Sequence, residues 1–168
     1  MDSSPSHTPG TLPLEDQILY VSCLLAYRSS PTGPPYTSSL KVVCHLPYPI
    51  PGPDEVCIRN RAVGLNHLDW KSLEHEVMID VWPEILGREV AGVVEMVGSN
   101  VKEYEVMVGQ AVVALTGPFD EKGVNSENWK QGLGVGRAGG FQDVTCVHKS
   151  RVARMPANWS FLRAAGVP

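Results

Sequence analysis

The sequence contains little cysteine and none of the cysteine patterns that bind structural zinc. Its four cysteines lie far apart, with no CxxC pair and no histidine at zinc-finger spacing. They are Cys23, Cys44, Cys57 and Cys146. This spacing predicts neither a zinc cage nor a disulfide scaffold, and a reducing cytoplasm is the simplest setting for such a chain.

Excess positive charge and long apolar runs are also missing. The formal net charge is -4, so no basic surplus can neutralise nucleic-acid phosphates or anionic lipid head groups. The longest apolar stretch near the start, residues 18–26, is far below the roughly 20 residues of a membrane span, and it follows two acidic residues. We therefore expect no nucleic-acid partner, no membrane partner and no targeting signal.

The first 39 residues differ in composition from the rest of the chain. Residues 1–10 and 29–39 are rich in serine, proline, threonine and glycine and offer almost nothing to bury. Between them, residues 14–27 fit either a short amphipathic helix or a strand, because periodicity cannot decide over so few residues. We predict a poorly ordered N-terminal extension over residues 1–39.

Short apolar runs bounded by glycine and proline occupy the rest of the chain. Strands are predicted at residues 40–46, 55–64, 89–98, 110–115 and 141–147. Because closure removes exposed strand edges, this pattern predicts a mainly β domain with a few short helices, folded as a closed or partly open barrel over residues 40–157. A cap at Asn158 or Ser160 then opens a helix through Ala165, so residues 158–168 are predicted to begin a helix.

Three segments carry a family resemblance. They are PGPDEVCIRNRAVGLNHLDWK, ILGREVAGVVEMVGSNV and GGFQDVTCVHKSRVARMP. In this order they resemble the medium-chain dehydrogenase/reductases from about residue 41 to residue 168, and most of all the zinc-independent branch of quinone-reductase-like and fungal-type trans-enoyl reductases. The resemblance implies a GroES-like, partly open β-barrel whose partner Rossmann domain is missing from the chain.

The resemblance also implies that no metal is bound. Asn66 and Arg88 stand where zinc-dependent members place a cysteine and a histidine, and neither is a usual zinc ligand. The closely spaced cysteines of the family's structural zinc lobe are absent between residues 115 and 139. Glu89, which stands where zinc enzymes carry a carboxylate near the metal, is expected to pair with Arg88.

The segment NHLDWK, residues 66–71, resembles the turn that faces the nicotinamide of NADPH in the zinc-free branch. The resemblance implies that Lys71 neutralises charge on the cofactor or an enolate, and that Asn66 donates a hydrogen bond. It implies that Leu68, Asp69 and Trp70, together with Lys71, shape the cofactor-binding cleft. Without the resemblance, Lys71 is an exposed lysine and Asp69 a turn residue or helix cap.

His67 departs from the family pattern, which commonly has proline at this position. Losing the fixed φ of proline loosens the turn. Imidazole titrates near neutrality, but a histidine beside a tryptophan turn is more often a surface residue than a proton donor, and we favour the surface role.

Residues 134–139, GVGRAG, satisfy the dinucleotide pattern GxGxxG. That pattern binds pyrophosphate only between a strand and a helix, whereas here a polar loop precedes it and a β-run follows it. We interpret it as a flexible glycine-rich loop.

Three functional hypotheses remain open from the sequence. The first is a truncated NADPH-dependent reductase of an enone, an enoyl thioester or a quinone, inactive alone because the domain that anchors the cofactor is missing. The second is a non-catalytic GroES-like interaction module or subunit, and the third is a relic that does not fold. A homo-oligomer or a partner protein could cover the apolar interdomain face.

Overall fold

The computed structural model describes residues 20–28, 40–76, 79, 82–116 and 139–166. This part of the chain forms mainly strands, with two short α-helices and one 3-10 helix. The strands are β1 (Tyr20–Ala26), β2 (Leu40–Pro47), β3 (Glu55–Gly64), β4 (Glu84–Ile85), β5 (Glu89–Val97), β6 (Ala111–Leu115), β7 (Val144–His148) and β8 (Val152–Arg154). The helices are α1 (His67–His75), η3 (Lys149–Arg151) and α2 (Phe161–Ala165).

The larger sheet has the strand order β7-β3-β5-β6-β8, and every neighbouring pair is antiparallel. Valines that alternate along these strands share one face and form the main core cluster. Its buried members are Val56, Ile58, Val90, Val94, Val106, Val112, Ala114 and Val147. On the opposite face of β3, Cys57 packs with Val21 and Val144, so both faces of this strand are covered.

The smaller sheet has the order β2-β1-β4. Along β1, Val21, Cys23 and Leu25 alternate and are all buried, which explains why this segment is a strand rather than a helix. The prediction of a poorly ordered segment over residues 1–39 is therefore wrong for Tyr20–Ala26. The rest of that prediction, apart from Tyr27 and Arg28, lies outside the described residues.

The two sheets are joined through the segment before β7. The Leu24 backbone N–H donates to Phe141 O at 2.8 Å, and the Asp143 N–H donates to Ser22 O at 2.9 Å. The Asp143 carboxylate in turn accepts from the Ser22 N–H. Because Phe141 and Asp143 pair with β1, β7 begins only at Val144, three residues later than the sequence predicts.

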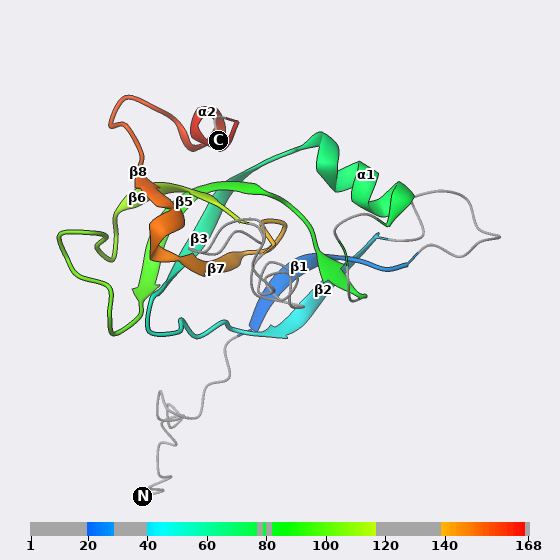
Figure 1. The fold of residues 1–168 in the computed structure, drawn as a ribbon, viewed down its shortest axis with the longest axis horizontal. Coiled ribbons are helices and arrows are strands. Elements are labelled where there is room, and N and C mark those ends of the chain that lie inside the picture. Colours follow the sequence, from blue (N-terminus) through cyan, green and yellow to red (C-terminus); the bar gives the residue numbers. More distant parts are fainter. Residues whose placement is uncertain (1–19, 29–39, 77–78, 80–81, 117–138, 167–168) are drawn as a thin grey trace, which may run out of the picture.

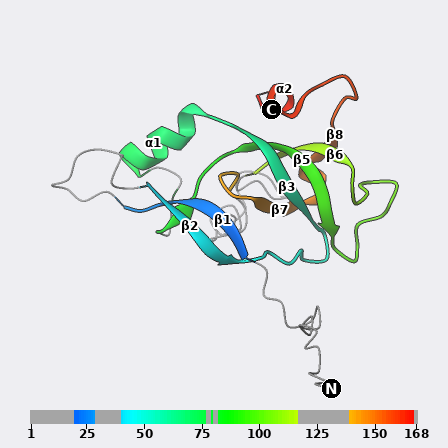
Figure 2. The ribbon, with the colours of Figure 1, turned by 180° about the vertical axis from the view of Figure 1, so that it is seen from behind.

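The prediction of a mainly β, partly open barrel is confirmed: the described strands curve around one core without closing into a full barrel. Both views show α1 and α2 on the same side of the sheets (Figures 1 and 2). Ser160, one of the two expected caps, opens α2 by accepting from the Arg163 N–H, and α2 then packs against β3 and β5.

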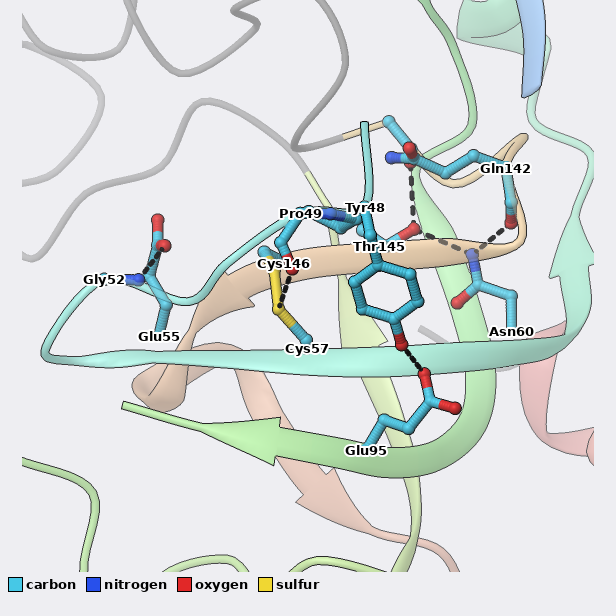
Figure 3. The surroundings of a disulfide bond; sticks show 11 residues. Tyr48, Pro49, Gly52, Glu55, Cys57, Asn60, Glu95, Gln142, Thr145 and Cys146 are labelled. Atoms are coloured by element: carbon cyan, nitrogen blue, oxygen red, sulfur yellow. Dashed lines mark hydrogen bonds between the residues drawn. A yellow bond between two sulfur atoms is a disulfide. The ribbon is translucent and has the colours of Figure 1, made fainter. Parts of the chain in front are cut away.

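Cys57 and Cys146 form a disulfide between β3 and β7 (Figure 3). The two residues are opposite each other in the antiparallel register, with their Cα atoms 4.1 Å apart, and both are buried. The prediction that the cysteines form no disulfide is therefore wrong for this pair. A sequence separation of 89 residues hides the pairing, which only the strand register reveals. It also removes the cysteine-based reason for expecting a reducing compartment.

None of the described helices has the length and apolar character needed to cross a membrane.

Candidate functional site

Helix α1 begins at a capping box formed by two of the predicted site residues. Asn66 is the N-cap, and its side-chain oxygen accepts from the Leu68 N–H at 2.9 Å. Asp69 Oδ2 accepts from the Asn66 N–H at 2.9 Å. These two contacts satisfy backbone donors that the first turn of a helix otherwise leaves unpaired. The interpretation of Asp69 as a helix cap is confirmed.

The second oxygen of Asp69 attaches the helix to the segment before β5. Oδ1 accepts from the Gly87 N–H at 3.0 Å, and the Asp69 side chain is buried. Gly87 has a φ of 97°, a conformation that glycine adopts without steric cost. Thr116 fixes the same segment from β6, because its N–H donates to Arg88 O at 2.7 Å and its hydroxyl donates to Gly87 O.

Arg88 and Glu89 have different partners from those expected. The Asn66 side-chain N–H donates to Glu89 Oε1 at 3.2 Å. Arg88 interacts electrostatically with Asp69 and Glu84. The expected Arg88–Glu89 pair is thus replaced by two separate contacts, because the side chains of successive residues in extended chain point to opposite faces.

Trp70 and Lys71 lie on the outer face of α1. Trp70 is 44% exposed, and the Lys71 ammonium lies 5.8 Å from the centroid of its ring. Trp70 Nε1–H donates to His67 Nδ1 at 3.2 Å, which leaves the proton of a neutral His67 on Nε2. His67 is exposed, in agreement with the expectation of a surface residue.

The structure therefore divides the predicted site in two. Asn66 and Asp69 point toward the segment before β5 and are occupied by protein contacts. Trp70 and Lys71 offer an exposed aromatic ring and a cation, and Leu68 is half-buried between the two groups. The functional roles given to these five residues stay predictions.

Glu84 is a buried acidic residue that the sequence analysis missed. It is 1% exposed, and its Oε1 accepts from the neighbouring Ile85 N–H at 3.0 Å. Burial raises the pKa of Glu84 to about 7, opposed by the Ile85 hydrogen bond and the charge of Arg88. Burial likewise lowers the pKa of Arg88, opposed by Asp69 and Glu84. The signal available in the sequence was a single carboxylate within the apolar run VWPEIL.

In the described ranges, no group of three or more histidine, cysteine, aspartate or glutamate side chains could hold a metal ion. The candidate dinucleotide pattern at residues 134–139 lies outside those ranges except for Gly139, which is buried and accepts hydrogen bonds from Gln142 and Thr145.

Residues 52–157 match the family model of the alcohol dehydrogenase GroES-like domain, and this stretch contains every candidate site residue. The chain belongs to this family. Curated relatives place the GroES-like domain within the medium-chain dehydrogenase/reductases, as the resemblance predicted. The dehydrogenase pigH of Monascus ruber is 33% identical over 125 residues, which are 73% of this chain and 31% of that protein.

Two further relatives have names that describe reductases. A quinone oxidoreductase of Pseudomonas aeruginosa is 32% identical over 70% of this chain and 30% of its own length. The trans-enoyl reductase tndF of Aspergillus flavipes is 31% identical over 73% of this chain and 32% of its own length. The chain thus spans about a third of the length of the curated relatives it matches.

Solved structures share the GroES-like fold. A quinone oxidoreductase of Pseudomonas syringae pv. tomato has a TM-score of 0.64 at 28% identity, covering 86% of this chain and 36% of that one. A cobalt- and zinc-bound alcohol dehydrogenase of Pyrobaculum aerophilum has a TM-score of 0.65 at 28% identity, covering 88% and 45%. The fold is therefore shared by proteins with and without a metal in their description.

Proposed function

We propose that this GroES-like domain forms the substrate side of a zinc-free, NADPH-dependent oxidoreductase that reduces a quinone, an enone or an enoyl thioester. The observation that carries the proposal is the centre formed by Asn66 and the segment Gly87 to Glu89, where a guanidinium replaces a metal-binding side chain. The quinone oxidoreductase and trans-enoyl reductase names of the relatives support the choice of reaction.

The donor set at this centre does not fit zinc. Zinc is bound by thiolate, imidazole or carboxylate, and a permanently charged guanidinium cannot ligate it. The Asn66 amide oxygen is already used by the Leu68 N–H. The side chains at this centre cannot hold a metal ion as a Lewis acid. Side-chain and backbone donors of the protein must therefore balance the negative charge that develops during reduction.

The side chains on the outer face of α1 suit NADPH, because Trp70 presents an aromatic surface for a ring and Lys71 presents a cation for a negative charge. When bound, NADPH supplies the hydride. In this proposal Lys71 neutralises cofactor charge, Leu68 and Trp70 shape the cofactor cleft, and Asn66 offers its remaining amide N–H. The capping box keeps Asn66 in place throughout.

We further propose that the cofactor phosphates are anchored by a nucleotide-binding domain outside these 168 residues. Support comes from the share of the relatives that the chain covers, about a third. The partners of the complete assembly are then a small-molecule acceptor and NADPH, with no nucleic acid or membrane. A cytoplasmic setting stays a prediction, and so does a homo-oligomer or a partner that covers the apolar face.

Two measurements test this function. Titration of the 168-residue chain with NADPH should give no saturable binding below the millimolar range, and a micromolar constant would contradict the need for a second domain. A chimera that joins the chain to the nucleotide-binding domain of the Monascus ruber relative should oxidise NADPH with a quinone or an enoyl thioester.

In that chimera, Lys71→Gln should slow turnover by about tenfold or more, while the exposed Lys102→Gln should have no effect. A folded chimera that binds NADPH but reduces neither acceptor would show that the proposed reaction is wrong and would favour the interaction-module hypothesis.

A further inference from the structure

A group of buried and half-buried polar side chains lies beneath α1, on the face of the helix opposite to Trp70 and Lys71. We call it the subhelical cluster and define it by Asp69, Ser72, Trp82, Glu84 and Arg88. Asp69 and Ser72 are three residues apart on the buried face of α1. Trp82 lies two residues before Glu84, the first residue of β4, and Trp82 packs with Leu73 in the apolar group under the helix.

Three atoms of this cluster are buried without a hydrogen-bond partner among the described residues. They are Ser72 Oγ, Trp82 Nε1 and Glu84 Oε2. Buried polar atoms are almost always paired, and an unpaired group costs about 1–3 kcal/mol, so each of these atoms is expected to have a partner that the described residues do not supply. The set contains donors as well as an acceptor.

Arg88 is the cation of the cluster. It is half-buried, and its guanidinium donates no hydrogen bond to any residue in the described part of the chain. Asp69 acts on Arg88 through its charge, and its carboxylate oxygens accept backbone N–H groups from Asn66 and Gly87. A guanidinium has five N–H donors in a planar fork, a geometry that suits an oxygen carrying negative charge.

The position of Arg88 also suits a reacting centre. Its backbone is fixed on both sides, by Asp69 through Gly87 and by Thr116. It is next in sequence to Glu89, which holds Asn66. Lys71, the other candidate cation, is exposed on the outer face of α1 and interacts with Trp70. Partial burial makes the charge of Arg88 more effective than that of an exposed lysine.

We propose that Arg88 binds the acceptor oxygen that becomes negatively charged during reduction, with the buried Asp69 carboxylate as the fixed negative charge that orients its guanidinium. This inference rests on the proposed function and names the residue that replaces the metal in it. When a hydride adds to the β-carbon of an enone or enoyl thioester, the electron pair of the C=C bond moves toward the carbonyl and leaves negative charge on that oxygen. The α-carbon then takes a proton from water.

The test uses 4-nitrophenolate, a stable oxyanion whose absorbance reports its environment, and needs neither NADPH nor a second domain. At pH 8.5 the 168-residue chain should bind it saturably, and Arg88→Gln should weaken binding at least tenfold. Arg88→Lys, which keeps the charge but loses the fork, should weaken it by a smaller factor and serves as the second variant if Arg88→Gln does not fold. Glu84→Gln should strengthen binding several-fold, because it removes a negative charge from the surroundings of Arg88.

Two matched controls complete the design. Arg61→Gln removes an exposed arginine from β3 and Lys102→Gln removes an exposed lysine, and neither should change the affinity for 4-nitrophenolate. The proposal is overturned if Lys71→Gln and not Arg88→Gln abolishes binding, if Glu84→Gln weakens it as much as Arg88→Gln does, or if the wild-type chain shows no saturable binding. Failure of the chimera to oxidise NADPH while Arg88-dependent binding persists would instead count against the proposed reaction alone.

Discussion

Asp69 makes two structural contacts, although the sequence predicted only a cap or a cofactor contact for it. One oxygen caps α1 and the other holds the Gly87 N–H, so a single buried carboxylate fixes the angle between the helix and β5. The predicted cofactor role and the observed structural role are compatible, but the structural contacts already explain why an aspartate stands there.

Asp69→Asn should therefore destabilise the chain. Asparagine keeps one acceptor and turns an N–H₂ group toward a backbone N–H, which leaves two buried donors facing each other at a cost of about 1–3 kcal/mol. Urea unfolding measures the change in the free energy of unfolding. Glu103→Gln, at an exposed position, should leave that free energy unchanged within error.

Glu84 predicts a pH dependence of stability. Burial raises its pKa from 4.5 to about 7, so between these values the folded state binds more protons than the unfolded state. The contribution of Glu84 to the free energy of unfolding is greatest below pH 4.5 and is lost as the pH rises to 7. Above pH 7 it no longer changes. The raised pKa of Glu84 corresponds to about 3 kcal/mol in the free energy of unfolding.

The comparison of wild type with Glu84→Gln at pH 5 and pH 8 isolates this effect. The wild-type chain should lose stability relative to the variant on going from pH 5 to pH 8, by up to about 3 kcal/mol in urea unfolding. Parallel pH profiles for the two proteins would show that Glu84 is ionised in the folded state throughout this range.

At the scale of elements, α2 depends on a close approach to β3. A Cβ at Gly64 would overlap the backbone O of Ala165 and approach Glu89 Oε2 to 2.8 Å. Ala164 and Ala165 are buried against Ala91, so the small residues on both sides permit the contact.

Gly64→Ala should detach α2 or shift it, with a cost of roughly 1–3 kcal/mol from overpacking. The expected observation is faster amide hydrogen exchange in α2 and a lower unfolding midpoint. Gly166→Ala is the matched control, because its nearest atom would be 3.9 Å away and its φ is negative, so it should be close to neutral. Equal effects of the two substitutions would contradict this packing.

The disulfide gives a prediction about thiol counts. Cys44 is exposed, Cys23 is buried with a free thiol whose pKa burial raises, and the other two cysteines are bonded. A chromogenic disulfide reagent should therefore titrate one thiol in the native chain, two after denaturation, and four after reduction of the denatured chain. Four thiols in the denatured, unreduced chain would show that Cys57 and Cys146 are not joined.

The elements also show what sequence reasoning could reach. The strand over residues 55–64 was predicted with its observed bounds, because Val56 and Ile58 alternate with polar residues and proline and glycine bound the run. β1 was left undecided, because a strand of seven residues with neighbours 14 or more positions away has no local signal that separates it from a helix. The Asn66–Asp69 cap follows from local spacing, whereas Arg88 and Glu84 meet Asp69 only through the tertiary fold.

At the scale of the whole molecule, the side of the sheets that carries the helices exposes large apolar residues. Leu65 is 88% exposed and Leu162 is 81% exposed, in segments that meet where Gly64 approaches Ala165. Isolated exposed leucines are common, but two on segments that approach each other favour a surface that a partner or a second copy covers.

The double substitution Leu65→Ser with Leu162→Ser should reduce concentration-dependent self-association, measured by light scattering, without lowering the unfolding midpoint. Val42→Ser, at a residue 71% exposed on β2, is the control for a general loss of apolar surface. If Val42→Ser reduces self-association equally, the effect does not belong to the helix side.

The Cys57–Cys146 bond turns the polypeptide between these residues into a covalent ring. A protease that cuts once anywhere inside the ring would leave both fragments attached, so a nicked chain would migrate as a single band until a thiol is added. Proteins nicked within this span could accordingly keep their sheets intact and escape notice in any assay that omits the reductant.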